Sequence, residues 1–292
     1  MSEISIGDSL PQTTLASLDI AGAVAYLTLR RDDVFNALNP ELIDDITELL
    51  EWTSHRSVAE RGTLTDDSGA PYLRVVVLAG AGRHFCAGAD IDWMRDAGTK
   101  SSEENRADSE RLDRLFNNLW SHPCFTIASV HGVALGGGAG LVACCDHAIA
   151  TSGSRIALSE AKLGILPAVI GPYVYRRVGS AQFRRLATLA GTFEPEEALM
   201  IGMVDQIAAS AEDASRLIDE AIETVLTTGP VAVKEAKSLT DSFDRWMGTD
   251  EELREWALDK TSEMRASAEG QEGLAAFLEG RKPTWSSEDQ DG

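Results

Sequence analysis

Residues 130–141 read Val130-His131-Gly132-Val133-Ala134-Leu135-Gly136-Gly137-Gly138-Ala139-Gly140-Leu141. The apolar start predicts a strand, the glycines predict a loop, and the small residues that follow predict a helix. Glycines at such a junction let the backbone approach a ligand closely and leave N–H groups unpaired at a helix N-terminus. A similar stretch lies upstream, where an apolar run at 75–80 precedes Phe85-Cys86-Ala87-Gly88-Ala89-Asp90. Two such loops could direct two N–H donors at one oxygen atom.

The composition is that of an ordinary globular protein with a large acidic excess. Of the 292 residues 43% are hydrophobic, and 26 basic against 47 acidic residues give a net charge of −21. The acidic excess disfavours nucleic acids and anionic membranes as partners, because both would be repelled. It leaves open a small polyanion held by a local basic cluster. Residues 1–10 lack the apolar core of a signal peptide, and no apolar run reaches the length of a membrane span, so we expect a cytoplasmic protein.

The four cysteines do not form a pattern typical of a metal site. Cys86, Cys124, Cys144 and Cys145 include no CxxC pair and have no histidine at ligand spacing, so we expect no bound metal. Cys86 could in principle be a nucleophile, but His84, two positions away, would point elsewhere on an extended chain. We therefore interpret all four as small buried side chains.

The order of predicted elements indicates an α/β fold. Strands are predicted at 23–29, 74–78, 125–130, 147–150, 155–157 and 202–207, with helices between them. Only helices follow, at 211–226, 230–242, 249–266 and 269–278. Asn39 and Pro40 are typical of a helix start, whereas polar residues 54–70 predict an exposed loop. Residues 99–108 are a candidate lid or crossover. We therefore divide the chain into an α/β core at 17–207, a helical C-terminal subdomain at 208–283, and flexible termini at 1–16 and 284–292.

Five segments in order make the chain resemble the crotonase (enoyl-CoA hydratase/isomerase) superfamily over residues 20–283. They are Arg31 with Asn36-Ala37-Leu38; residues 80–90; His131-Gly132 with Gly136-Gly137-Gly138 and Cys145-Asp146; Ser159-Glu160 with Gly164-Ile165-Leu166-Pro167; and Phe277 to Pro283. Within the superfamily, residues 89–94 and 162–170 look most like bacterial methylglutaconyl-CoA hydratase-like members. The resemblance implies a spiral of ββα units with C-terminal helices that form a homotrimer, or a homohexamer made of two trimers. It also implies an acyl-CoA thioester as substrate, with coenzyme A as part of that substrate and no separate cofactor.

The resemblance assigns the backbone N–H groups of Ala89 and Gly137 to the thioester oxygen. An enolate forms only during the reaction, and fixed N–H dipoles can stabilise it without reorganising. The alternative is that the glycines simply make tight turns. Further substrate or CoA contacts are implied for Arg31, Ala87, Asp90, Ile91, Gly136 and Gly140, and Arg83, Arg281 and Lys282 are candidate phosphate partners. Phe277 and Lys282 resemble residues that cover CoA, often from a neighbouring subunit, although generic surface charge also explains the basic ones.

Glu160 occupies the position where the resemblance places a catalytic carboxylate. An apolar surrounding would favour its neutral form and let it exchange protons near neutral pH; the alternative is a solvated glutamate at a helix start. Two-glutamate hydratases have their second acid at the position of Gly140. Here either Glu160 would act alone in hydrating a 2-enoyl-CoA, such as 3-methylglutaconyl-CoA, or the substrate's own groups would help. A Δ3,Δ2-enoyl-CoA isomerase and a non-catalytic acyl-CoA-binding scaffold are the alternatives. Ala168 stands where dienoyl-CoA isomerases have an acid, and Gly140 could leave room for a branched or carboxylated chain.

Overall fold

A six-stranded sheet forms the centre of the protein, whose computed structural model describes residues 9–286. Its strand order is β1-β2-β3-β4-β6-β8. The hairpin of β1 and β2 is antiparallel and every other neighbouring pair is parallel. The strands span β1 (Ala16–Ala21), β2 (Val24–Leu29), β3 (Val75–Gly80), β4 (Phe125–Val130), β6 (His147–Thr151) and β8 (Gln206–Ala208).

A second, smaller layer of strands pairs beside the sheet and carries the glycine loops. It contains β5 (Val133–Leu135) and β7 (Arg155–Ala157), which are parallel. Single bridges extend it, from Cys86 to Ala134 and from Leu38 to Ala89. Each turn of the chain thus adds a strand to the large sheet, then one to the small layer, then a helix. The predicted spiral of ββα units is confirmed.

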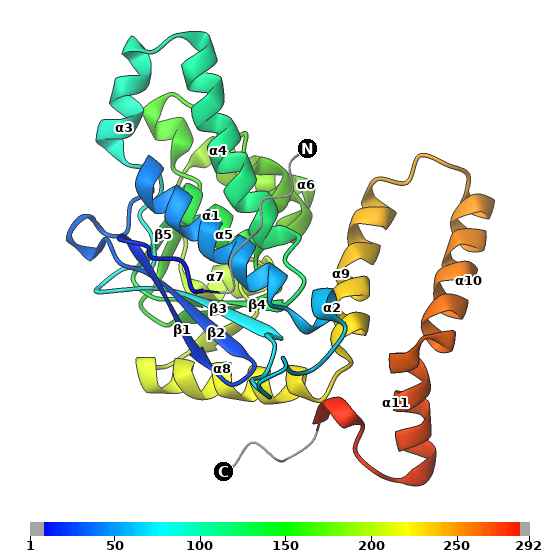
Figure 1. Ribbon diagram of the computed structural model, residues 1–292. Helices are drawn as coiled ribbons and strands as arrows, with labels where there is room; N and C mark the ends of the chain where they lie inside the picture. The colour runs from blue at the N-terminus through cyan, green and yellow to red at the C-terminus, as the bar shows by residue number, and fades with distance from the viewer. Residues whose placement is uncertain (1–8, 287–292) are drawn as a thin grey trace.

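The helices lie around these two layers, except for the last three, which extend away from them (Figure 1). They are α1 (Pro40–His55), α2 (Val58–Arg61), α3 (Ile91–Asp96), α4 (Ser102–Trp120), α5 (Gly137–Cys144), α6 (Gly171–Leu189), α7 (Pro195–Met200) and α8 (Ala211–Leu226), followed by α9 (Pro230–Asp244), α10 (Asp250–Ala266) and α11 (Ala268–Glu279). Short 3₁₀ turns are η1 (Asp32–Val34), η2 (Ala97–Thr99), η3 (Glu160–Leu163) and η4 (Thr284–Ser286). The α1 start is as predicted, since the Asn39 side chain accepts a hydrogen bond from the N–H of Leu42 and Pro40 opens the helix.

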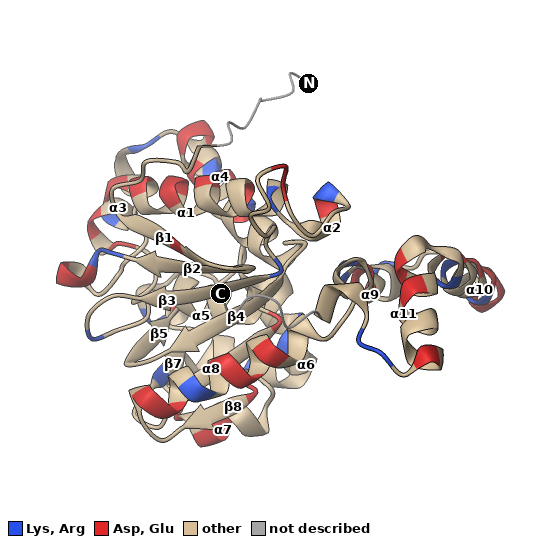
Figure 2. Cartoon of the chain, turned by 60° about the horizontal axis from the view of Figure 1, so that its bottom comes forward, with Lys and Arg blue, Asp and Glu red and all other residues tan. Residues whose placement is uncertain are grey.

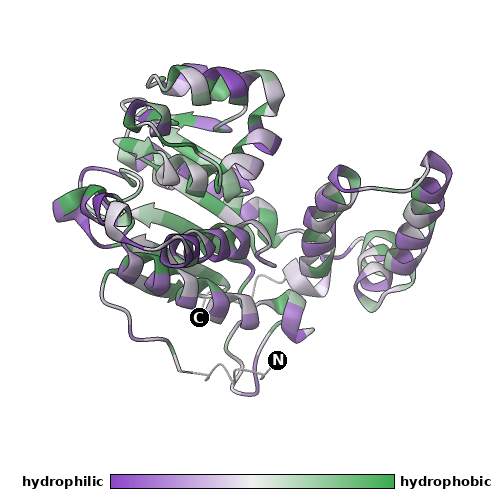
Figure 3. Cartoon of the chain, turned by 90° about the horizontal axis from the view of Figure 1, so that it is seen from above, coloured by the Kyte–Doolittle hydropathy of each residue, from purple (hydrophilic) through white to green (hydrophobic). Residues whose placement is uncertain are grey.

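The sheet is buried on both faces, which explains its apolar strand sequences. Val75 and Val77 of β3 belong to the core under α8, where Ile218 and Ile222 are buried. The alternate residues of β3 point to the opposite face, which packs into the larger core with α1, α4 and α5. Figure 2 shows charged residues mainly on the surrounding helices, and Figure 3 shows the strands as the more hydrophobic part of the molecule. The core therefore holds the inner strands, and the loops at their ends, in fixed positions.

Three elements differ from the sequence-based expectations. Strand β1 was not expected, because its outer residues are exposed and its apolar pattern is short. The candidate lid at 99–108 is mostly the beginning of α4, where Ser101 and Glu104 form a reciprocal capping box. The sequence predicts two separate helices, at 170–178 and 181–189, and the structure joins them in α6, with a kink at Gly179 where φ is 75°.

The three last helices, α9–α11, form an arm that projects from the body (Figure 1), and we call them the C-terminal arm. Polar contacts attach α9 to the body, including ion pairs of Lys237 with Asp146 and of Arg176 with Asp244. After the arm, η4 returns to the body, where the Trp285 carbonyl accepts a hydrogen bond from the buried guanidinium of Arg74. The rest of the predicted flexible termini, 1–8 and 287–292, lies outside the described residues. Within residues 9–286, no helix combines the length and apolar character needed to cross a membrane.

Candidate active site

The two glycine loops meet at one point of the small strand layer. Gly88 has a φ of 90°, and a Cβ built on it would lie 2.6 Å from the Leu135 carbonyl oxygen and 3.5 Å from the Gly137 nitrogen. A Cβ built on Gly137 would in turn lie 3.9 Å from the Ala89 nitrogen. Only glycine allows both the left-handed backbone and this close approach at residue 88. The backbone nitrogens of Ala89 and Gly137 are thereby neighbours.

Hydrogen bonds on either side leave the N–H groups of Ala89 and Gly137 unpaired. The Leu38 N–H donates to the Gly88 carbonyl, and the Leu38 carbonyl accepts from the Asp90 N–H. Ala89 lies between Gly88 and Asp90, so its N–H points away from Leu38. Gly137 is the first residue of α5, where N–H groups have no acceptor within the helix. Among the hydrogen bonds of residues 9–286, neither N–H has a partner. The site therefore presents two free backbone donors next to a helix N-terminus, which favours bound negative charge.

The carboxylate of Glu160 lies beside these donors. Its Oε1 atom would be 3.0 Å from a Cβ placed on Gly136, so glycine at 136, with φ of 49°, is needed for this approach. Its Oε2 atom is buried and has no hydrogen-bond partner within the described part of the chain. Burial raises the pKa of Glu160 above the ordinary value of a glutamate. A carboxyl group held in this way is available for proton transfer.

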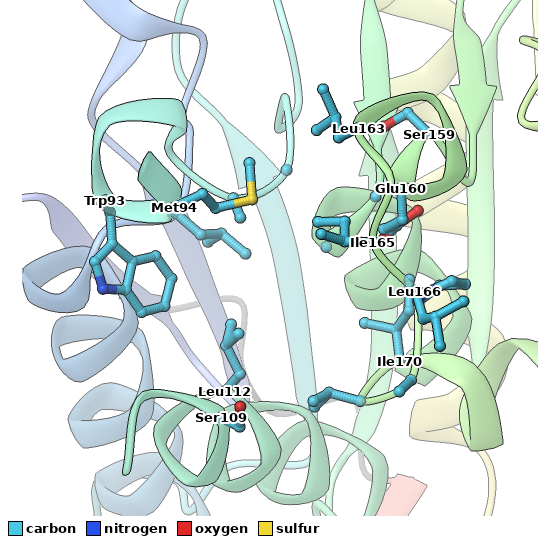
Figure 4. A pocket seen from close by; sticks show the side chains of 18 of the residues that line it. Trp93, Met94, Ser109, Leu112, Ser159, Glu160, Leu163, Ile165, Leu166 and Ile170 are labelled. Carbon is cyan, nitrogen blue, oxygen red and sulfur yellow. The ribbon is translucent and has the colours of Figure 1, made fainter. Parts of the chain in front are cut away.

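A cavity of about 520 Å³ opens in front of Glu160 and the two N–H groups. Figure 4 shows Trp93 and Met94 on one side, Glu160 and Ile165 on the opposite side, and Ser109 and Leu112 on α4 below. Of the predicted contacts, the lining includes Ala87, Ala89, Ile91, Gly136, Gly137 and Glu160. These positions, taken from distant parts of the sequence, share one cavity.

Gly140 is buried and does not line this cavity. A Cβ on Gly140 would lie 2.4 Å from Ile170 Cγ2 and 3.0 Å from Phe116 Cε1. Both of those side chains do line the cavity. Ile170 and Phe116 thus fill the room that the absent side chain at 140 leaves, and they separate Gly140 from the substrate space.

Arg31 and Asp90, two of the predicted CoA contacts, form an ion pair with each other. Arg31 Nη1 lies 2.6 Å from Asp90 Oδ2 and also donates to the Ala37 carbonyl. Asp90 caps α3 as well, because its other oxygen accepts from the N–H groups of Asp92 and Trp93. The pair fixes the loop that carries the Ala89 N–H, and a contact of either side chain with CoA stays a prediction.

The predicted C-terminal contacts lie away from the cavity within one chain. Phe277 is 83% exposed on α11, and the cavity lining includes no residue of the C-terminal arm. Arg281 is ion-paired with Glu272 and Glu279 of the same helix. A contact of Phe277 or Lys282 with CoA stays a prediction.

The histidines and cysteines singled out in the sequence lie outside the cavity. His131 contacts the Gly82 carbonyl, and His84 packs edge-on against Phe35. The four cysteines are buried, as predicted, and burial raises the pKa of the Cys86 thiol to about 12. Residues 9–286 contain no group of three or more His, Cys, Asp or Glu placed to hold a metal ion.

Two features of the site were not assigned in the sequence. Asn36 is fully buried with φ of 55°, donates to the carbonyls of Ala81 and His84, and accepts from the Arg31 N–H, so it ties the two motifs together. In the sequence, the only indication of this role is that an asparagine stands between a polar turn and a helix, because asparagine tolerates a left-handed backbone. The second feature is Asp108 of α4, which accepts from Trp93 Nε1 and Lys100 Nζ. No local pattern predicts that contact across 15 residues.

The spiral fold, the paired N–H donors and the buried carboxylate together indicate an enzyme that stabilises negative charge on a substrate oxygen. Comparison with known proteins identifies the family. The chain belongs to the enoyl-CoA hydratase/isomerase family, whose model matches residues 19–288. It is 30% identical to a putative enoyl-CoA hydratase of Thermus thermophilus, over 90% of this chain and 97% of that protein. It is 29% identical to a crotonyl-CoA hydratase of Syntrophomonas wolfei, over 90% and 95%. An enoyl-CoA hydratase structure from Shewanella pealeana superposes with a TM-score of 0.84 at 33% identity, covering 94% of this chain and 97% of the other.

Proposed function

We propose that the protein hydrates a 2-enoyl-CoA with Glu160 as its single acid–base group. The observation that carries this proposal is the unpartnered Oε2 of Glu160 beside the two unpaired N–H groups of Ala89 and Gly137. Family membership and relatives named as enoyl-CoA and crotonyl-CoA hydratases support the same substrate class.

In the proposed reaction, the thioester oxygen lies between the Ala89 and Gly137 N–H groups. The Glu160 carboxylate takes a proton from water while the water oxygen bonds to the β-carbon of the enoyl group. Electrons of the double bond move toward the thioester, forming an enolate whose charge the two N–H dipoles stabilise. The neutral Glu160 then returns its proton to the α-carbon. One molecule of water is added and the carboxylate is regenerated, so no second acid is needed.

Replacing Glu160 by glutamine tests the proposal most directly. Glu160→Gln keeps the size of the side chain but cannot exchange a proton, so we expect kcat for a 2-enoyl-CoA to fall by about 10²–10⁴-fold with little change in acyl-CoA affinity. Glu196→Gln, on the exposed surface of α7, is the matched control and should keep full activity. Unchanged turnover by Glu160→Gln would contradict the proposal and favour an acyl-CoA-binding scaffold.

A Δ3,Δ2-enoyl-CoA isomerase is the second candidate function. It is favoured by Ile170 and Phe116, which occupy the space beside Gly140 so that no second carboxylate approaches Glu160 there. A single carboxylate suffices to move one proton from the α-carbon to the γ-carbon. Incubation with a 2-enoyl-CoA and with a 3-enoyl-CoA separates the two, because only the hydratase produces a 3-hydroxyacyl-CoA from the former.

The finer expectations from the resemblance belong to the same proposal. We include 3-methylglutaconyl-CoA among the substrates to be assayed. We also propose a trimer, or two stacked trimers, in which the C-terminal arm of one copy reaches the CoA site of another. The projecting arm and the exposed Phe277 support this arrangement, and the mass of the protein in solution tests it.

A further inference from the structure

We propose that the substrate carries an apolar acyl chain longer than four carbons, and that Trp93 sets the length that the cavity accepts. This inference rests on the proposed function, since it specifies the acyl group of the same substrate. It derives from the end of the cavity that faces Glu160 from α3 and α4.

The first observation is the apolar lining of this end. Trp93 and Met94 face Ile165 across the cavity, and Leu112 lies below them (Figure 4). At its rim, Ile91 is 62% exposed, Leu163 is 54% exposed and Leu166 is 80% exposed. Large apolar side chains grouped at the mouth of a cavity indicate an apolar ligand, because the ligand would remove them from water.

The second observation is that the polar side chains from α4 are already engaged. Asn105 donates to the Ala97 carbonyl, and the Ser109 hydroxyl donates to the Asn105 carbonyl. The Asp108 carboxylate accepts from Trp93 Nε1 at 3.2 Å and from Lys100 Nζ at 2.5 Å. A carboxylated acyl chain reaching this end would lose its hydration and find these polar groups already paired with one another, which costs free energy.

The third observation is how firmly the Trp93 side chain is held. Its backbone N–H lies in the first turn of α3, capped by Asp90, and its indole N–H is bonded to Asp108 of α4. Lys100 neutralises the same carboxylate, and the side chains of Asp108 and Lys100 are only 23% and 28% exposed. The indole is thus fixed between two elements and forms a wall, so the distance that an acyl chain can extend from Glu160 depends on its volume.

Lys162 is the cation of this cavity that has no ion pair among the described residues. It is exposed on η3, two residues after Glu160 in the chain. Pairing of Lys162 with an acyl carboxylate is the competing interpretation, and a carboxylated substrate tests it.

A chain-length series tests the proposal with the full-length protein. Substrates are 2-enoyl-CoA thioesters of 4, 6, 8, 10 and 12 carbons, together with 3-methylglutaconyl-CoA. Each buried methylene should raise kcat/KM by up to about fourfold, so we expect a gain of about tenfold or more from 4 to 8 carbons. The carboxylated thioester should react more slowly than the 6-carbon enoyl-CoA. Highest kcat/KM with the 4-carbon or the carboxylated substrate would overturn the proposal.

The wall residue is tested by two variants and one control. Trp93→Ala should move the optimum to longer chains and raise the ratio of kcat/KM for 12 carbons over 6 carbons by about tenfold, whereas Trp93→Phe should change it little. Trp285→Ala removes a tryptophan that is likewise hydrogen-bonded through its Nε1, to the Thr227 carbonyl, but lies outside both the cavity lining and the C-terminal arm, and should keep the wild-type ratio. An unchanged profile in Trp93→Ala would remove Trp93 from the proposal.

Binding separates this inference from the proposed chemistry. Affinities of butyryl-, octanoyl- and dodecanoyl-CoA are measured by calorimetry, which needs no turnover. Tighter binding of the longer chains without hydration of any enoyl-CoA would contradict the proposed function and leave the acyl-chain inference standing. Hydration together with equal affinities and equal kcat/KM across the series would contradict the acyl-chain inference and leave the proposed function standing.

Discussion

The two ends of the cavity are built differently. At the reactive end, the groups presented to the substrate are two backbone N–H groups and one buried carboxylate. The glycines that hold them have no room for a side chain, because neighbouring atoms occupy the place of a Cβ. At the acyl end, the surface consists of side chains from α3, α4 and the segment after η3, several of them exposed. The reactive end therefore depends on backbone geometry that tolerates almost no substitution, whereas the acyl end can change by exchanging one side chain for another.

Removing one backbone N–H donor from the reactive end should slow the reaction more than any change at the acyl end. Gly137 begins α5, where proline is tolerated, so Gly137→Pro deletes the N–H while keeping a helical start. We expect kcat to fall by about 10²–10³-fold relative to Gly137→Ala. Alanine is the matched control, because it retains the N–H and creates the same Cβ contact with Leu38 Cδ1, at 2.9 Å. Equal rates in the two variants, both verified as folded, would exclude Gly137 as a donor.

The contrast between the two ends also explains what the sequence could predict. Motifs around Gly88, Gly137 and Glu160 are local, since glycines at fixed spacings are required by the close packing of two loops, and the structure brings these three motifs together. The acyl end depends on contacts between distant side chains, such as Trp93 with Asp108, that leave no regular pattern in the sequence. The space beside Gly140 is the clearest example, because only packing reveals that Ile170 and Phe116 occupy it.

The boundary between the two ends can be probed at Gly140. A Cβ there would lie 2.4 Å from Ile170 Cγ2, so Gly140→Ala should lower the free energy of unfolding by about 1–3 kcal/mol through overpacking. In an Ile170→Ala background the same substitution should cost much less, since the obstructing methyl group is gone. Denaturant titration of the four proteins gives the coupling. Additive effects would mean that Ile170 does not fill this space.

The same coupling matters for installing a second acid. Gly140→Glu alone should destabilise the protein, because its Cβ meets the same atoms. Gly140→Glu therefore tests the effect of a second acid on hydratase activity only when it is combined with Ile170→Ala.

The buried carboxyl group of Glu160 should lower the free energy of unfolding slightly at neutral pH. Burial raises the pKa of Glu160 in the folded protein, so the folded state binds a proton more readily than the unfolded state. The free energy of unfolding therefore decreases as pH rises from the unfolded glutamate pKa through the folded one, and the full penalty remains above it. Glu160→Gln should raise Tm by about 1–2 °C at pH 7.5, with the difference vanishing near pH 4. Asp108→Asn should act in the opposite direction and lower Tm, because Asp108 is paired with Lys100 and Trp93. If Glu160→Gln also lowers Tm at pH 7.5, the carboxylate is stabilised in the free protein, and the distinction between a reactive end that costs stability and an acyl end that adds to it fails.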